Sequence, residues 1–389
     1  MTEPRITVSD PALRPIAEKV IAQQPLSHAD GLALYATRDL HGLGRLANYV
    51  RTRLHGDRVY FNRNRHINYT NVCALSCKFC SFYRKRGEEG AYEMPVEQVV
   101  ATAVKARDAG ATEVHIVGGL HPWLKFDYYL DMLKGIRAAA PDLHIKAFTA
   151  IEIIHFGRIS RRSVRDVLID LREAGLGSLP GGGAEIFDDR VHDEVFKGKV
   201  RADKWFDVHR TAHSLGIHTN ATMLYGHVET PAERVNHFIA LRELQQQSLA
   251  SSPAHFNCCI PLSFIPDRSE LGHLPGPTGL TDLKTLAIAR LMLDNISHIK
   301  AFWIMQGVGL SQLALDWGCD DLDGTVVWYD ITKREGHGGT THQELHLHDI
   351  HRLTREAGKT PVERDTLYRE VKRDPDTDRV QRPEPVPVY

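Results

Sequence analysis

The stretch MPVEQVVATAVKARDAGATEVHIVGG, residues 94–119, combines the two patterns that set the fold. Between Pro95 and Gly110 the apolar residues recur at helical spacing: Val96, Val99, Val100, Ala103 and Val104. A proline at the start and a glycine at the end are typical of helix ends. The following TEVHIVGG is short, apolar and rich in β-branched residues, which indicates a buried strand. The stretch therefore predicts a helix, then a buried strand that ends in a glycine turn.

The same alternation continues along the chain. Eight strand-like runs occur between residues 65 and 328, and each run except the last is followed by a helical pattern. Such alternation indicates parallel strands joined by crossover helices. Eight units favour an α/β fold of the (β/α)8 TIM-type barrel class, with a doubly wound sheet as the alternative. The expected strands are residues 65–71, 112–119, 144–150, 177–185, 217–226, 255–264, 298–306 and 320–328.

Signals at helix ends divide the chain further. Thr230 and Glu233 form a capping-box pattern around a proline, and Ser160 is expected to cap the helix that stops at Gly175. We expect four regions. Residues 1–65 form an N-terminal helical segment, and residues 66–330 form the barrel. Residues 331–370 form a C-terminal extension, which is a helix and a turn packed on the barrel, and residues 371–389 form a flexible proline-rich tail.

Composition excludes some functions. The 389 residues carry a net charge of −1, with 42% hydrophobic and 25% charged residues. This is an ordinary globular composition, and it lacks the basic excess of a general nucleic-acid binder. No signal peptide and no long uncharged apolar run are visible. The sequence therefore predicts a cytoplasmic protein that binds neither nucleic acid nor a membrane.

Three of the six cysteines cluster in NVCALSCKFCSFYRKRG, residues 71–87. Cys73, Cys77 and Cys80 have a CxxxCxxC spacing, which also marks one face of a helix, so they could be core residues. A structural zinc site needs four ligands, and His66 or His121 could complete it. A [4Fe–4S] cluster normally takes four thiolates. With three thiolates, one iron keeps an open position that a small molecule can chelate. The location after the first strand suits chemistry, because barrel enzymes keep their active sites at the carboxyl ends of the strands.

Two glycine-rich segments end the second and fourth strands. Gly118 and Gly119 in IVGGLHP either form a plain turn or let the backbone approach a ligand closely. LPGGGAE contains Gly181 and Gly182 but lacks the context of a P-loop or a dinucleotide fingerprint. A flat ligand lying against bare backbone explains this segment better than a plain loop does. Glu185 at its end is either a ligand-binding carboxylate or a helix cap.

Polar residues at other strand ends are expected to line a pocket. They are Glu152, Asn220, Thr222, Tyr225, His227 and Glu229. Arg268 could present its charge to an anion or be an exposed arginine. Met223, Cys258 and Cys259 are expected to pack in the barrel, and Cys319 is an isolated thiol.

The cysteine motif, with Phe79 before the third cysteine and SFY after it, resembles the radical S-adenosylmethionine (SAM) family. The resemblance implies that Cys73, Cys77 and Cys80 hold a [4Fe–4S] cluster and that SAM occupies the fourth iron, where it is cleaved to a 5′-deoxyadenosyl radical. A flavodoxin- or ferredoxin-type protein would supply the electron. It also implies that the segment with Gly118 and Gly119 binds the methionyl amine. The remaining cofactor-binding candidates are Glu152, the glycines Gly181 and Gly182, Glu185 on the ribose, and Phe79, Phe82 and Tyr83 beside the adenine.

A longer resemblance covers about residues 30–370. INYTNVC, GGLHPWLKFDYYLDMLKGIR, FTAIEI, AGLGSLPGGGAEIF, AHSLGIHTNATMLYGHVET, DDLDGT and REAGKTPVERDTLY are similar to the menaquinone-biosynthesis group that runs through futalosine. FTAIEI and TNATMLYGH resemble the aminofutalosine synthases of that group more than its dehypoxanthine futalosine cyclases. The resemblance implies that SAM is a co-substrate and that its adenosyl radical adds to 3-[(1-carboxyvinyl)oxy]benzoate.

This substrate is a dianion, so donor or cationic groups are expected near it. The candidates are His121, Asn220, His227 and Arg268. Two segments differ from the sequence that is usual in the group, and both are expected on the substrate side of the barrel. They are VVWYDITKREGHGG and HFNCCIPLSFIPDRSEL. The cyclase and a zinc-stabilised binding barrel without redox chemistry remain alternatives.

Overall fold

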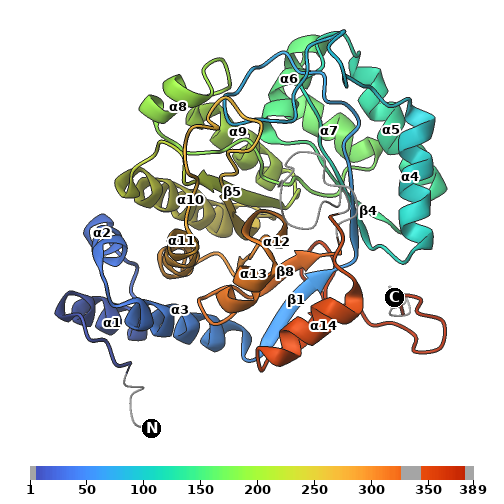
Figure 1. The fold of residues 1–389 in the computed structure, drawn as a ribbon. Coiled ribbons are helices and arrows are strands. Elements are labelled where there is room, and N and C mark those ends of the chain that lie inside the picture. The colour runs from blue at the N-terminus through green and yellow to red at the C-terminus, as the bar shows by residue number, and fades with distance from the viewer. Residues whose placement is uncertain (1–5, 326–342, 382–389) are drawn as a thin grey trace.

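A computed structural model describes residues 6–325 and 343–381 of the chain. Its centre is a barrel of parallel strands with helices around it (Figure 1). The first barrel strand consists of two consecutive pieces, β1 (Arg58–Asn62) and β2 (Asn64–Ile67). Because β1 pairs with β8 and β2 pairs with β3, this one strand has neighbours on both sides.

Two short bridges complete the ring. Lys146 in β4 bridges to Ser178, and the adjacent Leu179 bridges to Thr219 in β5, so residues 178–179 act as the fourth strand. Lys300, next to β7, bridges to Asp321 in β8. The strands therefore close into a barrel in sequence order, as the alternation predicts, and the doubly wound alternative is wrong. The other strands are β3 (Glu113–Ile116), β4 (His144–Ala147), β5 (Thr219–Tyr225), β6 (Phe256–Ser263), β7 (His298–Ile299), β8 (Asp321–Gly324) and β9 (Thr360–Glu363).

The helices bury apolar faces against the barrel or against one another. Thr230 and Glu233 form the expected capping box at the start of α10. Around the barrel lie α4 (Val96–Asp108), α5 (Phe126–Ala139), α6 (Ala150–Ser160), α7 (Val164–Ala174), α8 (Asp189–Val195), α9 (Ala202–Ser214), α10 (Pro231–Ser251), α11 (Gly279–Met292), α12 (Trp303–Gln306) and α13 (Val308–Ala314). No helix among the described residues has the length and apolarity that crossing a membrane requires.

The N-terminal segment consists of a short 3₁₀ turn (Pro11–Leu13), α1 (Arg14–Ile21), α2 (His28–Ala36) and α3 (Leu40–His55). Helix α2 packs on α10 and α3 packs on α11. The first barrel strand begins at Arg58, before the expected boundary at residue 66.

Two details of the expected elements are wrong. Ser160 is the last residue of α6, and Ser163 is the N-cap of α7, where its hydroxyl accepts a hydrogen bond from the Asp166 backbone N–H. The third strand also stops at Ala147, because Thr149 and Glu152 form a capping box that starts α6. Glu152 thus lies in the first turn of a helix.

The C-terminal part adds a strand to the barrel rim. After α14 (Leu347–Glu356), β9 pairs in parallel with β1, where a turn was expected. Figure 1 shows α14 beside β1. In the described part of the tail, Arg373 binds Glu363 and the Gly110 carbonyl, so residues 371–381 are anchored to the barrel. The segment VVWYDITKREGHGG (326–339) lies outside the described residues.

Candidate active site

A cavity of about 270 Å³ lies at the carboxyl ends of the barrel strands. Cys73, Cys77 and Cys80 all line it. Most of the other predicted site residues also lie on its wall: Phe79, Phe82, Tyr83, Gly118, Gly119, Glu152, Gly182, Glu185, Asn220 and Thr222. The fold therefore brings segments from most of the chain to one place.

The cysteines lie on a loop, since residues 68–95 contain no helix. Hydrogen bonds from Cys73, Ala74 and Lys85 hold the loop in place. The Cys73 N–H donates to the Arg84 carbonyl (3.0 Å), and the Ala74 N–H donates to the Leu120 carbonyl (2.9 Å). The Lys85 ammonium donates to the carbonyls of Cys73 (3.1 Å) and Leu75 (2.9 Å). The interpretation of the cysteines as one face of a helix is therefore wrong.

The three thiols line one cavity. All three are partly exposed to the cavity, whereas Cys258, Cys259 and Cys319 are fully buried elsewhere. The Leu120 backbone N–H points at the Cys73 sulfur (3.4 Å). Burial raises the pKa of the Cys77 thiol to about 12. A cationic metal offsets that cost, because it stabilises the thiolate. Three thiolates on one loop fit a [4Fe–4S] cluster with one open iron.

The glycine pair packs directly on the cysteine loop. A Cβ on Gly119 would lie 2.4 Å from the Val72 carbonyl oxygen, and one on Gly118 would lie 2.7 Å from the Tyr69 ring. Any side chain at either position would push the loop away. Glycine is thus required here for close packing, while both residues still expose backbone to the cavity.

Glu152 ties this region together. Its carboxylate accepts hydrogen bonds from the Tyr69 hydroxyl (2.7 Å), the Gly118 N–H (3.0 Å) and the Thr149 N–H (2.7 Å). Burial raises the pKa of Glu152 to about 6 despite these donors. Its carboxylate therefore positions the glycine pair at the cavity wall.

The second glycine segment is pressed between α6 and β5. A Cβ on Gly182 would lie 2.9 Å from the Thr149 side chain, and one on Gly181 would lie 2.0 Å from the Asn220 carbonyl oxygen. Gly181 also has a φ of +85°. It does not line the cavity, so its role is to allow the turn.

We predict that Gly181→Ala destabilises the fold by about 3 kcal/mol, because the added methyl group meets backbone and the positive φ is strained. Gly309→Ala is the matched control. Gly309 lies in α13, and a Cβ there would meet no atom of the described residues within 4 Å. The free energy of unfolding of Gly309→Ala should equal that of the wild type or exceed it by up to about 1 kcal/mol. Chemical denaturation measures both, and equal stabilities of the two variants would contradict the prediction.

Glu185 and the aromatic residues form another part of the wall. Glu185 pairs with Lys199, whose side chain is 9% exposed and which sequence patterns did not single out. Burial lowers the pKa of Lys199, but the Glu185 carboxylate and the Cys77 and Cys80 sulfurs together more than offset this, so the pKa is raised. The Lys199 ammonium lies 5.3 Å from the centre of the Phe79 ring. The Tyr83 hydroxyl donates to Glu270 (3.2 Å).

Three of the four residues expected near the substrate do not line the cavity. His121 accepts hydrogen bonds from the Trp123 and Leu124 N–H groups through Nδ1 and lies 2.8 Å from Glu93 through Nε2. His227 contacts the Leu224 carbonyl (3.1 Å) and Glu229 (3.3 Å). Arg268 is exposed, in a turn with φ +59°. Asn220 alone of the four is on the wall.

Two further polar candidates have structural partners. The Tyr225 hydroxyl donates to Asp282 (2.7 Å), and Glu229 pairs with Arg234 (2.6 Å). Met223, Cys258 and Cys259 are buried in the barrel as expected.

Sequence patterns missed a set of charged residues inside the barrel. Lys146, Lys300 and Asp323 line the cavity together with His66 and His115, and all lie on or beside barrel strands. A lysine inside a buried strand is uncommon, and the pentapeptide HIKAF occurs at both 144–148 and 298–302. That repeat is the signal that could have found them.

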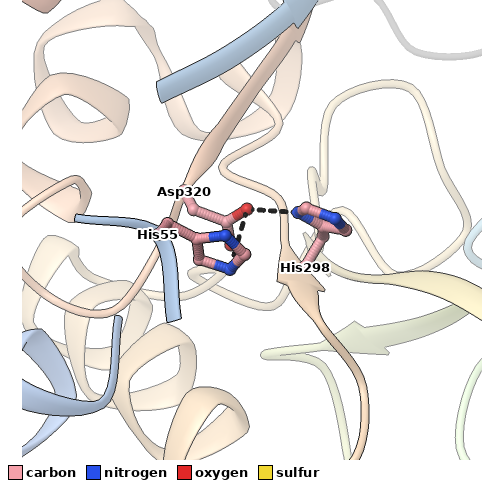
Figure 2. Close-up of side chains that lie close together, drawn as sticks. All are labelled: His55, His298 and Asp320. Atoms are coloured by element: carbon pink, nitrogen blue, oxygen red, sulfur yellow. Dashed lines mark hydrogen bonds and ion pairs between the residues drawn. The ribbon is translucent and has the colours of Figure 1, made fainter. Parts of the chain in front are cut away.

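A second group of metal-ligand residues lies at the opposite end of the barrel. Figure 2 shows His55 and His298 directed at the carboxylate of Asp320, and the three ligand atoms lie within 4.8 Å of one another. Both oxygens of the Asp320 carboxylate already accept hydrogen bonds from other residues. One oxygen accepts from Arg290 and the Ile299 N–H, and the other accepts from His298 Nδ1 (2.6 Å). Because the guanidinium charge opposes a cation, the group acts as a buried network that joins α3 to the barrel base.

Two protein families match parts of the chain. Residues 67–240 match the Radical SAM superfamily, and residues 256–377 match the CofH/MqnC C-terminal region. The chain belongs to the radical SAM superfamily, whose members use a [4Fe–4S] cluster and SAM. The expected fold class, enzyme class and cofactors are thereby confirmed.

Relatives that match over nearly their full length show which members of the superfamily the chain is similar to. The chain is 47% identical to aminodeoxyfutalosine synthase of Thermus thermophilus, over 94% of this chain and 97% of the relative. It is 45% identical to the Streptomyces coelicolor enzyme of the same name, over 96% and 98%. It is also 40% identical to 5-amino-6-(D-ribitylamino)uracil–L-tyrosine 4-hydroxyphenyl transferase of Methanopyrus kandleri, over 87% and 92%.

Solved structures share the fold at low identity. Methylornithine synthase aligns with a TM-score of 0.67 at 19% identity, over 89% of this chain and 97% of that one. The hydrogenase maturase HydG from Carboxydothermus hydrogenoformans aligns with a TM-score of 0.69 at 17% identity, over 92% and 80%. These two likenesses support the barrel alone.

Proposed function

We propose that this chain is an aminodeoxyfutalosine synthase. It would join the 5′-deoxyadenosyl group of SAM to 3-[(1-carboxyvinyl)oxy]benzoate, with aryl migration and loss of a carboxylate, and form 6-amino-6-deoxyfutalosine for menaquinone biosynthesis. The identity of 47% over nearly the whole of both chains carries the proposal. The match extends through the CofH/MqnC C-terminal region, which contributes Ile260, Leu262 and Lys300 to the cavity wall.

In this proposal Cys73, Cys77 and Cys80 hold the [4Fe–4S] cluster, which supplies the electron that cleaves SAM. The glycine pair, oriented by Glu152, offers backbone groups to the methionyl end of SAM. Glu185 binds the ribose, and the aromatic residues Phe79, Phe82 and Tyr83 pack near the adenine. Gly182 and Asn220 lie on the same wall. A flavodoxin- or ferredoxin-type protein donates the electron.

The apolar part of the wall also suits the reaction. Leu224, Ile260, Leu262 and Phe264 line the cavity and offer a dry surface for an aromatic ring. Such a surface also protects a radical from water and from stray hydrogen donors. We assign no role to His121, His227 and Arg268, since they lie off the wall.

A product analysis tests the proposal. The anaerobic, reconstituted and reduced enzyme is incubated with 3-[(1-carboxyvinyl)oxy]benzoate and SAM labelled in the adenosyl group. We expect the label in a product that also contains the benzoate, with methionine as by-product. Label recovered only as free 5′-deoxyadenosine would contradict the proposal and favour the cyclase.

A parallel incubation tests the activity for which the hydroxyphenyl transferase relatives are named. Their name specifies 5-amino-6-(D-ribitylamino)uracil and tyrosine as reactants. We expect no hydroxyphenyl transfer between these two compounds. Transfer at a rate above that of the benzoate reaction would replace the proposed substrate. Iron analysis of the same sample separates both enzymes from a zinc-stabilised binding barrel.

A further inference from the structure

The cavity continues from the cysteine loop into the barrel, where its wall is charged. Lys146 is 3% exposed and Lys300 is 2% exposed, yet both line the cavity. They occupy the same position in the two HIKAF segments; Lys146 lies on the third barrel strand and Lys300 directly follows the seventh. Strands three and seven face each other across an eight-stranded barrel. The cysteines lie on a loop beyond the strand ends, so the lysines mark the opposite end of the same cavity.

Each lysine has a carboxylate partner on the neighbouring strand. Lys146 lies 2.6 Å from Glu113, and Lys300 pairs with Asp323. Behind them Arg364 binds Asp321 (2.7 Å), and Thr366 donates to Glu113 (2.7 Å). The network as a whole balances three cations, Lys146, Lys300 and Arg364, against three carboxylates, Glu113, Asp321 and Asp323.

The charges are not distributed evenly with respect to the cavity. Among the described residues, the cavity wall includes Lys146, Lys300 and Asp323, while Glu113, Asp321 and Arg364 lie behind it. Within this network of six charged groups, two ammonium groups thus line the cavity against one carboxylate. An ammonium has three N–H donors, so each lysine can bind a ligand oxygen while it keeps its carboxylate partner. In a buried site such charge-assisted hydrogen bonds to an anion are strong.

Two histidines line the cavity at the same end as the lysines, which we call the floor of the cavity. The His66 and His115 rings lie 4.2 Å apart between their centres, on the first and second strands. Burial lowers the pKa of His66 to about 4 and holds that of His115 well below its usual range. Both rings are therefore neutral near pH 7. They add no charge of either sign to the wall.

We propose that Lys146 and Lys300 form a carboxylate-binding subsite at the floor of the cavity, and that it binds the ring carboxylate of the substrate. This inference rests on the proposed function. The other carboxylate of that substrate is bonded to the vinyl carbon next to the reacting centre, so it stays near SAM at the cysteine end. The ring carboxylate is meta to the ether oxygen and points away from the reacting carbon. Binding at the floor would then orient the enol ether toward the cysteine loop.

A binding experiment tests the subsite without turnover. The reconstituted enzyme is titrated with 3-methoxybenzoate, and uncharged 3-methoxybenzyl alcohol serves as the reference probe. We expect Lys300→Gln to weaken 3-methoxybenzoate binding between about 10-fold and about 100-fold. Glutamine can still donate to Asp323, which limits damage to the fold. Lys284→Met is the matched control, since Lys284 binds the Tyr35 and Thr37 carbonyls away from the cavity. Unchanged binding in Lys300→Gln would overturn the subsite.

Measurements of turnover distinguish a role of Lys300 in orienting the substrate from general damage to the fold. We expect Lys300→Gln to lower kcat/KM for 3-[(1-carboxyvinyl)oxy]benzoate by a similar factor and to leave 2-phenoxyacrylate, which lacks the ring carboxylate, nearly unchanged. Equal losses on both substrates would overturn the proposal, because they indicate a structural role. If the wild-type enzyme forms no adenosylated product while 3-methoxybenzoate still binds through Lys300, the proposed function fails and the subsite stands.

Discussion

Cys77→Ala is expected to remove the iron–sulfur cluster and, with it, all SAM cleavage. Cys77 lies between the other two cysteines in the sequence, and all three line one cavity. A cubane left with two protein ligands has no stable attachment. Iron after anaerobic reconstitution should fall from about four atoms per chain to near zero. The brown colour should disappear, and turnover should fall by at least about 10³-fold, since the cluster is the source of the electron that cleaves SAM.

Cys319→Ala is the control for this experiment. Cys319 is also a cysteine, but it is fully buried near the barrel base and does not line the cavity. We expect normal iron content and activity in this variant. Full iron content in Cys77→Ala would contradict the assignment of the ligands, and a colourless wild type that binds one zinc and no iron would contradict the cluster itself.

Stability should fall steeply below pH 6.5, because many histidines are buried in the neutral form. Burial is the largest cause of the lowered pKa in each case. The pKa is about 4 for His55, His66 and His144 and about 3 for His213 and His237. In the unfolded chain these side chains titrate at about 6.5.

The sign follows from proton binding. Above pH 6.5 neither state binds these protons, so the stability is fully present. Between pH 6.5 and about 4 the unfolded chain binds protons that the folded chain does not, so the free energy of unfolding falls as pH falls. Each histidine contributes up to about 1.4 kcal/mol per pH unit. Together the five should remove on the order of 5 to 10 kcal/mol by pH 5, which is comparable to the whole stability of a typical domain. Glu152, with its raised pKa, opposes this trend only slightly.

Denaturant unfolding at pH 7.5, 6.5, 5.5 and 5.0, followed by circular dichroism, measures the effect. Cluster absorbance is recorded separately so that loss of iron is not mistaken for unfolding. His237→Phe should reduce the pH slope, because it removes one buried neutral ring that stacks on Phe187. His348→Gln is the control, since that side chain is 76% exposed. A free energy of unfolding that stays constant from pH 7.5 to 5 would contradict the prediction.

Periodicity alone was sufficient for most of the fold. The helix over 96–108 and the strand over 113–116 form where the spacing of apolar residues places them. The capping box at Thr230 also forms as its sequence indicates. These features are local, because they depend on residues three or four positions apart. Strand β9 escaped prediction because it depends on a partner, β1, about 300 residues away in the chain.

The sequence by itself determined the barrel and the three-cysteine motif with its cofactors. It did so because strand–helix alternation and the spacing of thiols are readable along the chain. Only the tertiary structure decided which polar residues face the cavity. His121 and His227 point to local partners, whereas Lys146 and Lys300, far apart in sequence, share one floor. Closure of the barrel brings the two HIKAF strands face to face, and that pairing is a property of the closed ring and of no single segment.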